Sequence, residues 1–157
     1  MISRTAIILF LIVLFCSIVY GSELFYEEAV NRYNEGVRAQ KARDFYSAQT
    51  SYQKSIIIDK STRCKKYIFN NLGVLYIENG QVAKAEIAFR EALRLDPDYK
   101  IAASNLALLY LKLAISYKDR GDTARALDNF EKAFSYYPSR TFIIEGEKEL
   151  KADNSEN

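Results

Sequence analysis

Three asparagines recur at nearly equal spacing along the chain, and a carboxamide is a side chain that can recognise a peptide backbone. Asn34, Asn71 and Asn105 each lie two residues before a glycine or an alanine. Because an Asn side chain donates and accepts hydrogen bonds together, a row of them could clamp the main chain of a bound peptide without reading its sequence. The alternative is that the three carboxamides bond to neighbouring helix carbonyls or to water.

No other residue combination is typical of a catalytic or metal-binding site. The chain has no His, no Gly-rich phosphate loop, no nucleophile elbow and no pair of closely spaced cysteines. Its acidic clusters, Glu27-Glu28 and Glu145/Glu147/Glu149, are explained by exposed helix faces. We therefore expect a protein that is not an enzyme and that needs no cofactor and no metal.

Composition favours one helix-rich domain. The 157 residues are 49% hydrophobic and 27% charged, with only six Gly and two Pro to interrupt regular structure. The net charge of +2 is spread along the chain without a basic block, which argues against a nucleic-acid partner.

The N-terminal region has the features of a targeting segment. Residues 5–20 are almost entirely apolar and follow Arg4, which indicates a signal peptide cleaved after Gly21 or an uncleaved membrane anchor. The run is short against the roughly 20 residues that a spanning helix usually needs, but near the lower limit of about 17. A buried helix is disfavoured because every face is apolar. We expect the protein to be exported (periplasmic or extracytoplasmic), or anchored with residues 22–152 outside the cytoplasm.

The two cysteines carry little chemistry. Cys16 suggests a lipid attachment site, but Phe15 is too bulky for the place before such a cysteine. After cleavage Cys64 would be a lone thiol, which cannot form an internal disulfide. Intermolecular pairing is the alternative to a structural role.

Residues 66–99 have the pattern of two helices joined by a turn. Asn79-Gly80 separates two apolar periodicities, and Gly80 can close the first helix in the left-handed conformation. Pro97 is predicted to begin the next helix with Asp96 as its cap. The apolar positions of the pair are Phe69, Leu72, Gly73, Tyr76, Ala85, Phe89, Ala92 and Leu93.

This segment resembles a tetratricopeptide repeat, whose pattern is aromatic-x2-Leu-Gly-x2-Tyr, then Ala-x3-Phe, then Pro over about 34 residues. Residues 29–62 resemble it with erosion, since Arg32 and Glu35 replace the aromatic residue and the Leu. Residues 100–140 resemble it with an insertion. The resemblance implies an all-α, right-handed solenoid of three helix-turn-helix repeats, with a capping helix at 141–151. Residues 153–157 are expected to be a disordered tail.

The third repeat contains the same short pattern twice. Leu-Ala-x2-Tyr occurs at residues 106–110 and at 113–117, and Gly121 lies 41 residues after Gly80, seven more than the repeat length. Seven residues are nearly two helical turns, so the apolar stripe drifts by only about 20°. We predict one continuous helix from about Tyr99 to Asp119, roughly 10 Å longer than its neighbours. The alternative is an ordinary long amphipathic helix.

In the family the first helices of the repeats line a concave groove that holds a peptide. The resemblance places ten residues of this chain there: Tyr33, Asn34, Val37, Tyr67, Asn71, Val74, Ile77, Ile101, Asn105 and Leu108. Part of this stripe could instead pack against adjacent helices. Some family members grip chaperone C-termini with basic groove residues, but of the matching positions here only Asn71 fits, which disfavours an Hsp70/Hsp90-type partner.

These observations predict a non-enzymatic adaptor, exported or membrane-anchored, that binds a protein or peptide in its groove. The partner would be a subunit of envelope, secretion or surface-assembly machinery. The alternative is a self-associating scaffold, in which the lengthened helix forms a homodimer face. Its contact residues would be Leu111, Leu113 and Ile115.

Overall fold

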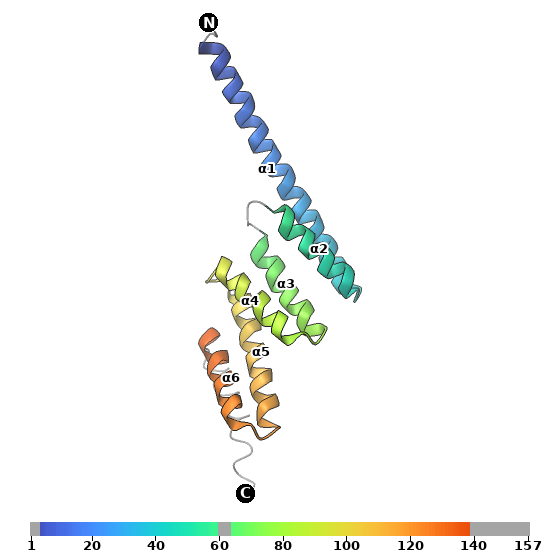
Figure 1. The fold of residues 1–157 in the computed structure, drawn as a ribbon, viewed down its shortest axis with the longest axis vertical. Helices are drawn as coiled ribbons and strands as arrows, with labels where there is room; N and C mark the ends of the chain where they lie inside the picture. The colour runs from blue at the N-terminus through green and yellow to red at the C-terminus, as the bar shows by residue number, and fades with distance from the viewer. Residues whose placement is uncertain (1–3, 60–63, 139–157) are drawn as a thin grey trace. The chain divides into compact units, whose positions relative to one another are not determined.

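The computed structural model describes residues 4–59 and 64–138, and every regular element within them is an α-helix (Figure 1). The expected all-α class is confirmed. The predicted capping helix at 141–151 and the tail at 153–157 lie outside the described residues. The helices are α1 (Arg4–Lys41), α2 (Phe45–Ile58), α3 (Lys65–Glu78), α4 (Val82–Leu95), α5 (Lys100–Lys118) and α6 (Thr123–Tyr136).

The chain divides into two compact units, residues 1–68 and residues 69–157. The division falls in the first turn of α3, so the first unit holds α1 and α2 and the second holds most of α3 with α4, α5 and α6. Each unit has buried residues of its own and is described by itself.

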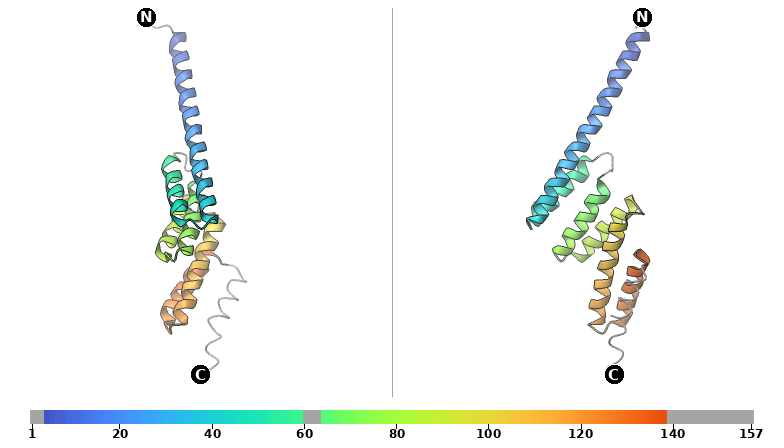
Figure 2. Two further views of the ribbon diagram at one scale, coloured as in Figure 1. Left: turned by 90° about the vertical axis from the view of Figure 1, so that its right-hand side faces the viewer. Right: turned by 180° about the vertical axis from the view of Figure 1, so that it is seen from behind.

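In the first unit, α2 lies beside the C-terminal half of α1 (Figure 2). Gly36 makes this close approach possible, because a Cβ at this position would lie 2.5 Å from Cδ1 of the buried Tyr52 ring. The hydroxyl of Ser55 donates a 2.6 Å hydrogen bond to the carbonyl oxygen of Ala29. Both residues are fully buried, so this bond ties the two helices together in a dry environment.

The N-terminal half of α1 extends beyond this pairing. Its large apolar side chains from Ile8 to Phe15 are exposed. By length and composition α1 could cross a membrane, and a signal sequence near the N-terminus would meet the same criteria. The helix continues through Gly21 without a break, so the proposed cleavage point is not marked by a change in secondary structure.

The second unit repeats the hairpin with α3 and α4. Gly73 lies against the Phe89 ring, and an added Cβ would be 2.6 Å from Cδ1 of that residue. Phe89 is fully buried in a core cluster that also contains Ala85, Leu106 and Tyr110. The predicted apolar faces of residues 66–99 therefore meet as expected.

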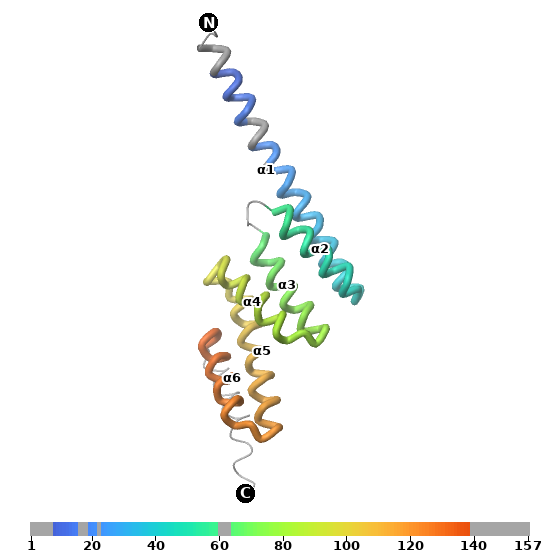
Figure 3. The backbone as a smooth tube through the Cα atoms, in the orientation of Figure 1, coloured from blue at the N-terminus to red at the C-terminus, as the bar shows by residue number. Residues whose placement is uncertain are grey.

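The predicted lengthened helix is confirmed as α5, which has 19 residues where α4 and α6 have 14 each. The excess of five residues is about 7.5 Å at 1.5 Å per residue, somewhat less than predicted. Ala107 and Tyr110 of the first Leu-Ala-x2-Tyr copy belong to the core cluster with Phe89. Ala114 of the second copy is also buried. The helix α6 lies beside α5 (Figure 3).

Each hairpin turns at one residue in the left-handed region. These residues are Arg43 (φ 59°), Gly80 (φ 70°) and Gly121 (φ 76°). The amide that follows each of them donates to a carbonyl five residues back, as from Gln81 to Tyr76 at 2.7 Å. This bond closes the preceding helix, and the role predicted for Gly80 is confirmed.

The predicted helix start at Pro97, with Asp96 as its cap, is wrong. Pro97 does not begin a helix, because α5 starts at Lys100 with Tyr99 as the N-cap residue. Asp96 ends α4 instead, and its Oδ1 accepts a 3.1 Å hydrogen bond from the amide of Asp98. An Asp side chain that bonds the backbone two residues on stabilises a turn, and this local bond displaces the helix start.

Candidate functional site

The predicted groove residues of α5 form an open apolar surface. Ile101 is 57% exposed and Leu108 is 49% exposed, and Asn105 lies between them on the same helical face. Within the described residues, both of these large side chains are far more exposed than the side chains of the core. This face can therefore bury apolar area against a partner.

The predicted groove residues of α3 are less accessible. Val74 and Ile77 are half-buried and pack against the core cluster of the second unit. The apolar character of these two positions is therefore explained in large part by packing within the protein. Tyr67, which lies before the unit boundary, is 43% exposed.

Two of the three predicted asparagines belong to one hydrogen-bonded chain. The Nδ2 of Asn105 donates to Oδ1 of Asn70 at 2.9 Å, and the Nδ2 of Asn70 lies 3.4 Å from Oδ1 of Asn71. Asn70 was not among the predicted site residues, although it is buried and joins the other two. The Asn70-Asn71 doublet was the only sequence signal for it. The role of Asn71 and Asn105 as a clamp stays a prediction.

The first unit presents its groove residues differently. Asn34 is exposed, while Tyr33 and Val37 are half-buried, and the Tyr33 ring centroid lies 6.0 Å from that of Tyr52. These three residues belong to the unit of residues 1–68 and are placed only within it.

The eroded positions of the first repeat form an ion-pair cluster. Arg32 Nη2 lies 2.8 Å from Glu28 Oε1, and its Nη1 lies 3.1 Å from Glu35 Oε2. The hydrogen bonds that Arg32 donates to Glu35 and to Glu28 raise the pKa of Arg32, because they favour the charged guanidinium. Charge pairing at the surface thus replaces the apolar contact of the consensus repeat.

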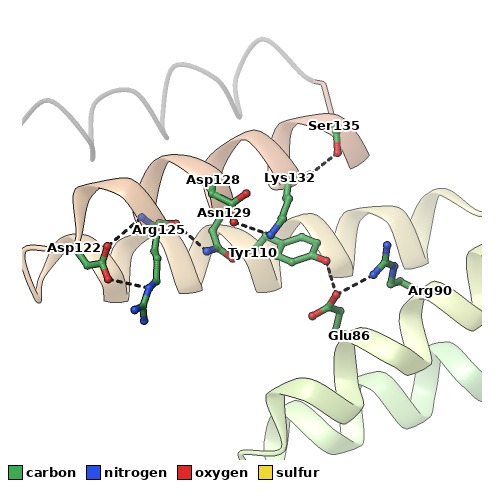
Figure 4. A network of polar contacts seen from close by, with 9 residues as sticks. All are labelled: Glu86, Arg90, Tyr110, Asp122, Arg125, Asp128, Asn129, Lys132 and Ser135. Atoms are coloured by element: carbon green, nitrogen blue, oxygen red, sulfur yellow. Dashed lines mark hydrogen bonds and ion pairs between the residues drawn. The ribbon is translucent and has the colours of Figure 1, made fainter.

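A pocket of about 480 Å³ lies between α4, α5 and α6. Its lining includes Glu86 and Arg90 from α4 and Tyr110, Leu113 and Tyr117 from α5. The remaining lining comes from α6 (Figure 4). Sequence reasoning missed this pocket because its lining residues are up to 50 positions apart (Glu86 to Tyr136).

Tyr110 is the central residue of this pocket. Its hydroxyl donates a 2.8 Å hydrogen bond to Glu86 Oε1, which also accepts from Arg90 Nη1 at 3.2 Å (Figure 4). Burial is the main cause of the raised pKa of Tyr110, and the hydrogen bond to Glu86 adds to it. The ring stacks on Tyr136 of α6, with centroids 6.0 Å apart and an interplanar angle of 18°.

Cations of α6 lie over tyrosine rings of α5. Lys132 Nζ is 5.9 Å from the Tyr110 ring centroid, and the Arg125 guanidinium is 5.4 Å from that of Tyr117. Each cation also pairs with a carboxylate on its own helix. Lys132 pairs with Asp128 at 2.6 Å and Arg125 with an oxygen of the N-cap residue Asp122 at 3.0 Å.

The residues suggested for a homodimer face do not form an exposed patch. Leu111, Leu113 and Ile115 are each half-buried, and the first two pack against the core cluster. Cys64 is buried, and its amide donates to Asp59 Oδ2 at 3.0 Å, which disfavours intermolecular pairing of its thiol. Among the described residues no group of three His, Cys, Asp or Glu side chains could hold a metal ion.

Two segments match family models described as tetratricopeptide repeat, residues 67–99 and residues 108–139. The second match begins 41 residues after the first, in phase with the second Leu-Ala-x2-Tyr copy at 113–117. The first match covers nearly the whole of the repeat predicted at residues 66–99. The seven-residue insertion lies on the N-terminal side of the second match, which covers the third predicted repeat.

Similar proteins include the Photosystem I assembly protein Ycf3 of Cyanophora paradoxa, at 28% identity over 71% of this chain. The matched region is 64% of that relative, so the chain spans less than two thirds of its length. The protein of the same name from Prochlorococcus marinus (strain MIT 9211) is 27% identical over 76% of this chain and 73% of the relative.

Two solved structures share the fold. The N-terminal domain of stress-induced protein-1 (STI-1) from C. elegans aligns with a TM-score of 0.58 at 18% identity, covering 80% of this chain and 96% of that one. The Arabidopsis OM64 TPR domain aligns with the same TM-score at 19% identity, covering 82% and 98%. The likeness confirms the predicted class of helix-turn-helix solenoid.

Proposed function

Because the chain is a tetratricopeptide repeat protein, we propose that it is a non-catalytic adaptor whose first helices hold a protein partner. Its relatives named Ycf3 are called assembly proteins, which supports a partner that is a subunit of a larger complex. The class of partner is therefore a protein subunit of a larger complex.

The observation that carries this proposal is the open face of α5. Ile101 and Leu108 expose large apolar side chains on either side of Asn105. Burial of such area contributes about 25 cal/mol per Å², less the cost of ordering the partner. The partner's apolar side chains would cover the two residues, and its main chain would lie near the carboxamide.

The asparagine chain supplies the polar part of this face. Asn105 holds Asn70 at 2.9 Å, and this bond fixes the carboxamide plane before a partner arrives. A pre-oriented carboxamide loses less side-chain freedom on binding. Asn71 and Asn105 would set the register of the partner's main chain, while Ile101 and Leu108 provide most of the contact area.

Residues 5–20 would hold the adaptor at a membrane. The exposed apolar side chains between Ile8 and Phe15 support this location, as does the continuity of α1 with the first repeat. The alternative is export with cleavage after Gly21. N-terminal sequencing of the mature chain distinguishes them: Met1 at the start supports the anchor, and Ser22 at the start supports cleavage.

Photo-crosslinking tests the adaptor role. A benzophenone amino acid replaces Leu108 in one variant of the full chain and Leu127 of α6 in a matched control. The two positions have nearly the same exposure, 49% and 50%, but lie on a first and a second helix of the repeats. We expect a discrete crosslinked protein from position 108 and none from position 127.

Equal crosslinking from both positions would indicate non-specific contact and would contradict the proposal. Absence of any product from position 108, with the probe incorporated and the chain helical, would contradict it as well. The double variant Asn71→Ala with Asn105→Ala should then weaken the crosslink while helicity is unchanged, because the register residues are lost.

A further inference from the structure

The pocket between α4, α5 and α6 follows from the seven-residue insertion. Gly121 lies 41 residues after Gly80, where a regular repeat would place it after 34. α5 is accordingly about 7.5 Å longer than the neighbouring helices, and α6 starts farther along it than in a regular array. The second helices α4 and α6 line the pocket from different sides, and α5 forms its floor through Tyr110, Leu113 and Tyr117.

This pocket lies away from the predicted groove. At about 100° per residue, the α5 positions that face the pocket are on average about 150° around the helix from Ile101, Asn105 and Leu108. A ligand in the pocket would thus contact the opposite side of α5. The pocket volume of about 480 Å³ falls in the range of ligand sites and suits a few side chains of a peptide.

The charges of the pocket favour an anion. Three lining residues are cationic (Arg90, Arg125 and Lys132) and two are acidic (Glu86 and Asp128), which leaves one positive charge. Glu86 is the less exposed acid, and one of its oxygens already accepts from both Tyr110 and Arg90. Its charge is therefore largely satisfied within the protein.

The cations are held in place but remain available. Lys132 and Arg125 lie over tyrosine rings, which restricts their motion. Their carboxylate partners are on the same helix, in exposed pairs that contribute little to stability. A ligand carboxylate can therefore replace those partners at low cost and bridge cations of two helices.

We propose that this pocket is a second binding site, separate from the groove, and that it takes a short acidic peptide segment with an aromatic residue. The carboxylates of the segment would pair with Arg90 of α4 and Lys132 of α6. Its aromatic side chain would lie against Leu113 and Tyr117. The site does not depend on the partner proposed for the groove, since it uses other residues and the other side of α5.

Fluorescence anisotropy of the full chain in detergent micelles tests this site. The probe is a short fluorescein-labelled peptide of alternating Glu and Tyr, and the charge-reversed peptide of Lys and Tyr is its control. We expect the acidic peptide to bind with an affinity that falls as salt rises, and the basic peptide to show no binding. Equal binding of the two peptides would overturn the proposal.

Charge-removing variants locate the bound peptide. Arg90→Gln with Lys132→Gln should weaken binding by about tenfold or more, because both cations that bridge the helices are lost. Lys100→Gln with Lys112→Gln removes the same charge from α5 outside the pocket and should leave the affinity unchanged. Unchanged affinity in the pocket variant, or an equal loss in the control, would overturn the proposal.

Deletion of residues 107–113 tests the origin of the pocket. It joins Leu106 to Ala114 and restores both the Leu-Ala-x2-Tyr pattern and the 34-residue spacing between Gly80 and Gly121. We expect the shortened chain to keep its helical circular dichroism and to lose peptide binding. A helical deletion variant that binds like the wild type would overturn the proposal. If the deletion variant does not fold, the charge variants decide.

Discussion

The hairpin of α1 and α2 and the hairpin of α3 and α4 are built around the same contact with different residues. In one, Gly36 lies against the buried ring of Tyr52, and in the other Gly73 lies against that of Phe89. The turn of the first is made by Arg43 in the left-handed region and that of the second by Gly80.

The difference shows which repeat positions are exchangeable. The first repeat has Arg32 and Glu35 in place of the consensus aromatic and Leu. These two residues pair with each other, and Arg32 also pairs with Glu28. Both of these hairpins keep the glycine, because a Cβ at either position would enter the ring of the facing helix. In these two hairpins the close approach of the backbones is therefore kept while the apolar surface changes.

Removal of the buried ring should have the largest effect and should be similar in both hairpins. Phe89→Ala and Tyr52→Ala should each lower the free energy of unfolding by about 3–5 kcal/mol, because each leaves a cavity at a fully buried position. Urea unfolding followed by circular dichroism measures both.

Phe130 is the matched control for this comparison. It occupies the same repeat position in α6 but is only half-buried, so Phe130→Ala should cost clearly less. A loss as large as that of Phe89→Ala would mean that the third hairpin uses the same contact after all.

A methyl group at either glycine should have the next largest effect. Gly73→Ala and Gly36→Ala should each cost about 1–3 kcal/mol, because a rigid buried ring must move to accept the added Cβ. Gly21→Ala should not destabilise the protein, because a Cβ added at Gly21 would meet no atom of another part of the chain within 4 Å. Thermal unfolding of the three variants tests this order, and a neutral Gly73→Ala would contradict the close-approach argument.

The turns should respond in opposite directions. Arg43→Gly should raise the free energy of unfolding by about 0.5–1 kcal/mol, because Gly adopts positive φ without the penalty of a side chain. Gly80→Ala should lower it by about 1–2 kcal/mol for the converse reason. Chemical denaturation of each variant provides the measurement, and the same sign for both would show that turn strain is not the cause.

The helix caps should give the smallest difference, visible only in acid. Asp44 accepts a hydrogen bond from the amide of Ser47, which lowers the pKa of its carboxyl, whereas the cap residue Gln81 of α4 makes no such bond. Stability from Asp44 is therefore present above its unfolded pKa near 3.9 and is lost as pH falls through the lower folded value. Asp44→Asn should reduce the loss of stability between neutral and acidic pH, and an unchanged pH profile would exclude this contribution.

Local patterns in the sequence predicted the elements well. The turn at Gly80 was predictable because a glycine stands where the repeat pattern requires a turn. The length of α5 was predictable because a seven-residue insertion keeps the apolar residues on the same face of the helix. The helix start predicted at Pro97 was wrong because the Asp96 side chain can either cap a helix or stabilise a turn. In the structure it stabilises a turn, by accepting a hydrogen bond from the amide of Asp98.

The site was predicted only in part, because it depends on neighbours distant in sequence. Ile101 and Leu108 are exposed as a groove requires, but Val74 and Ile77 also serve the core. The bond from Asn105 to Asn70 joins residues 35 positions apart, and no single-helix periodicity indicates it. The pocket beside Tyr110 likewise exists only once three helices are placed together.

The central claim is that a partner binds the first-helix side of the repeats. Its most direct test is the dissociation constant between the full chain and the partner recovered by crosslinking at position 108. Ile101→Glu with Leu108→Glu should weaken this complex by about tenfold or more, since charges replace the buried apolar contacts. Ile87→Glu with Leu127→Glu, at similarly exposed positions on second helices, should leave the constant unchanged, and an unchanged constant for the first pair would contradict the claim.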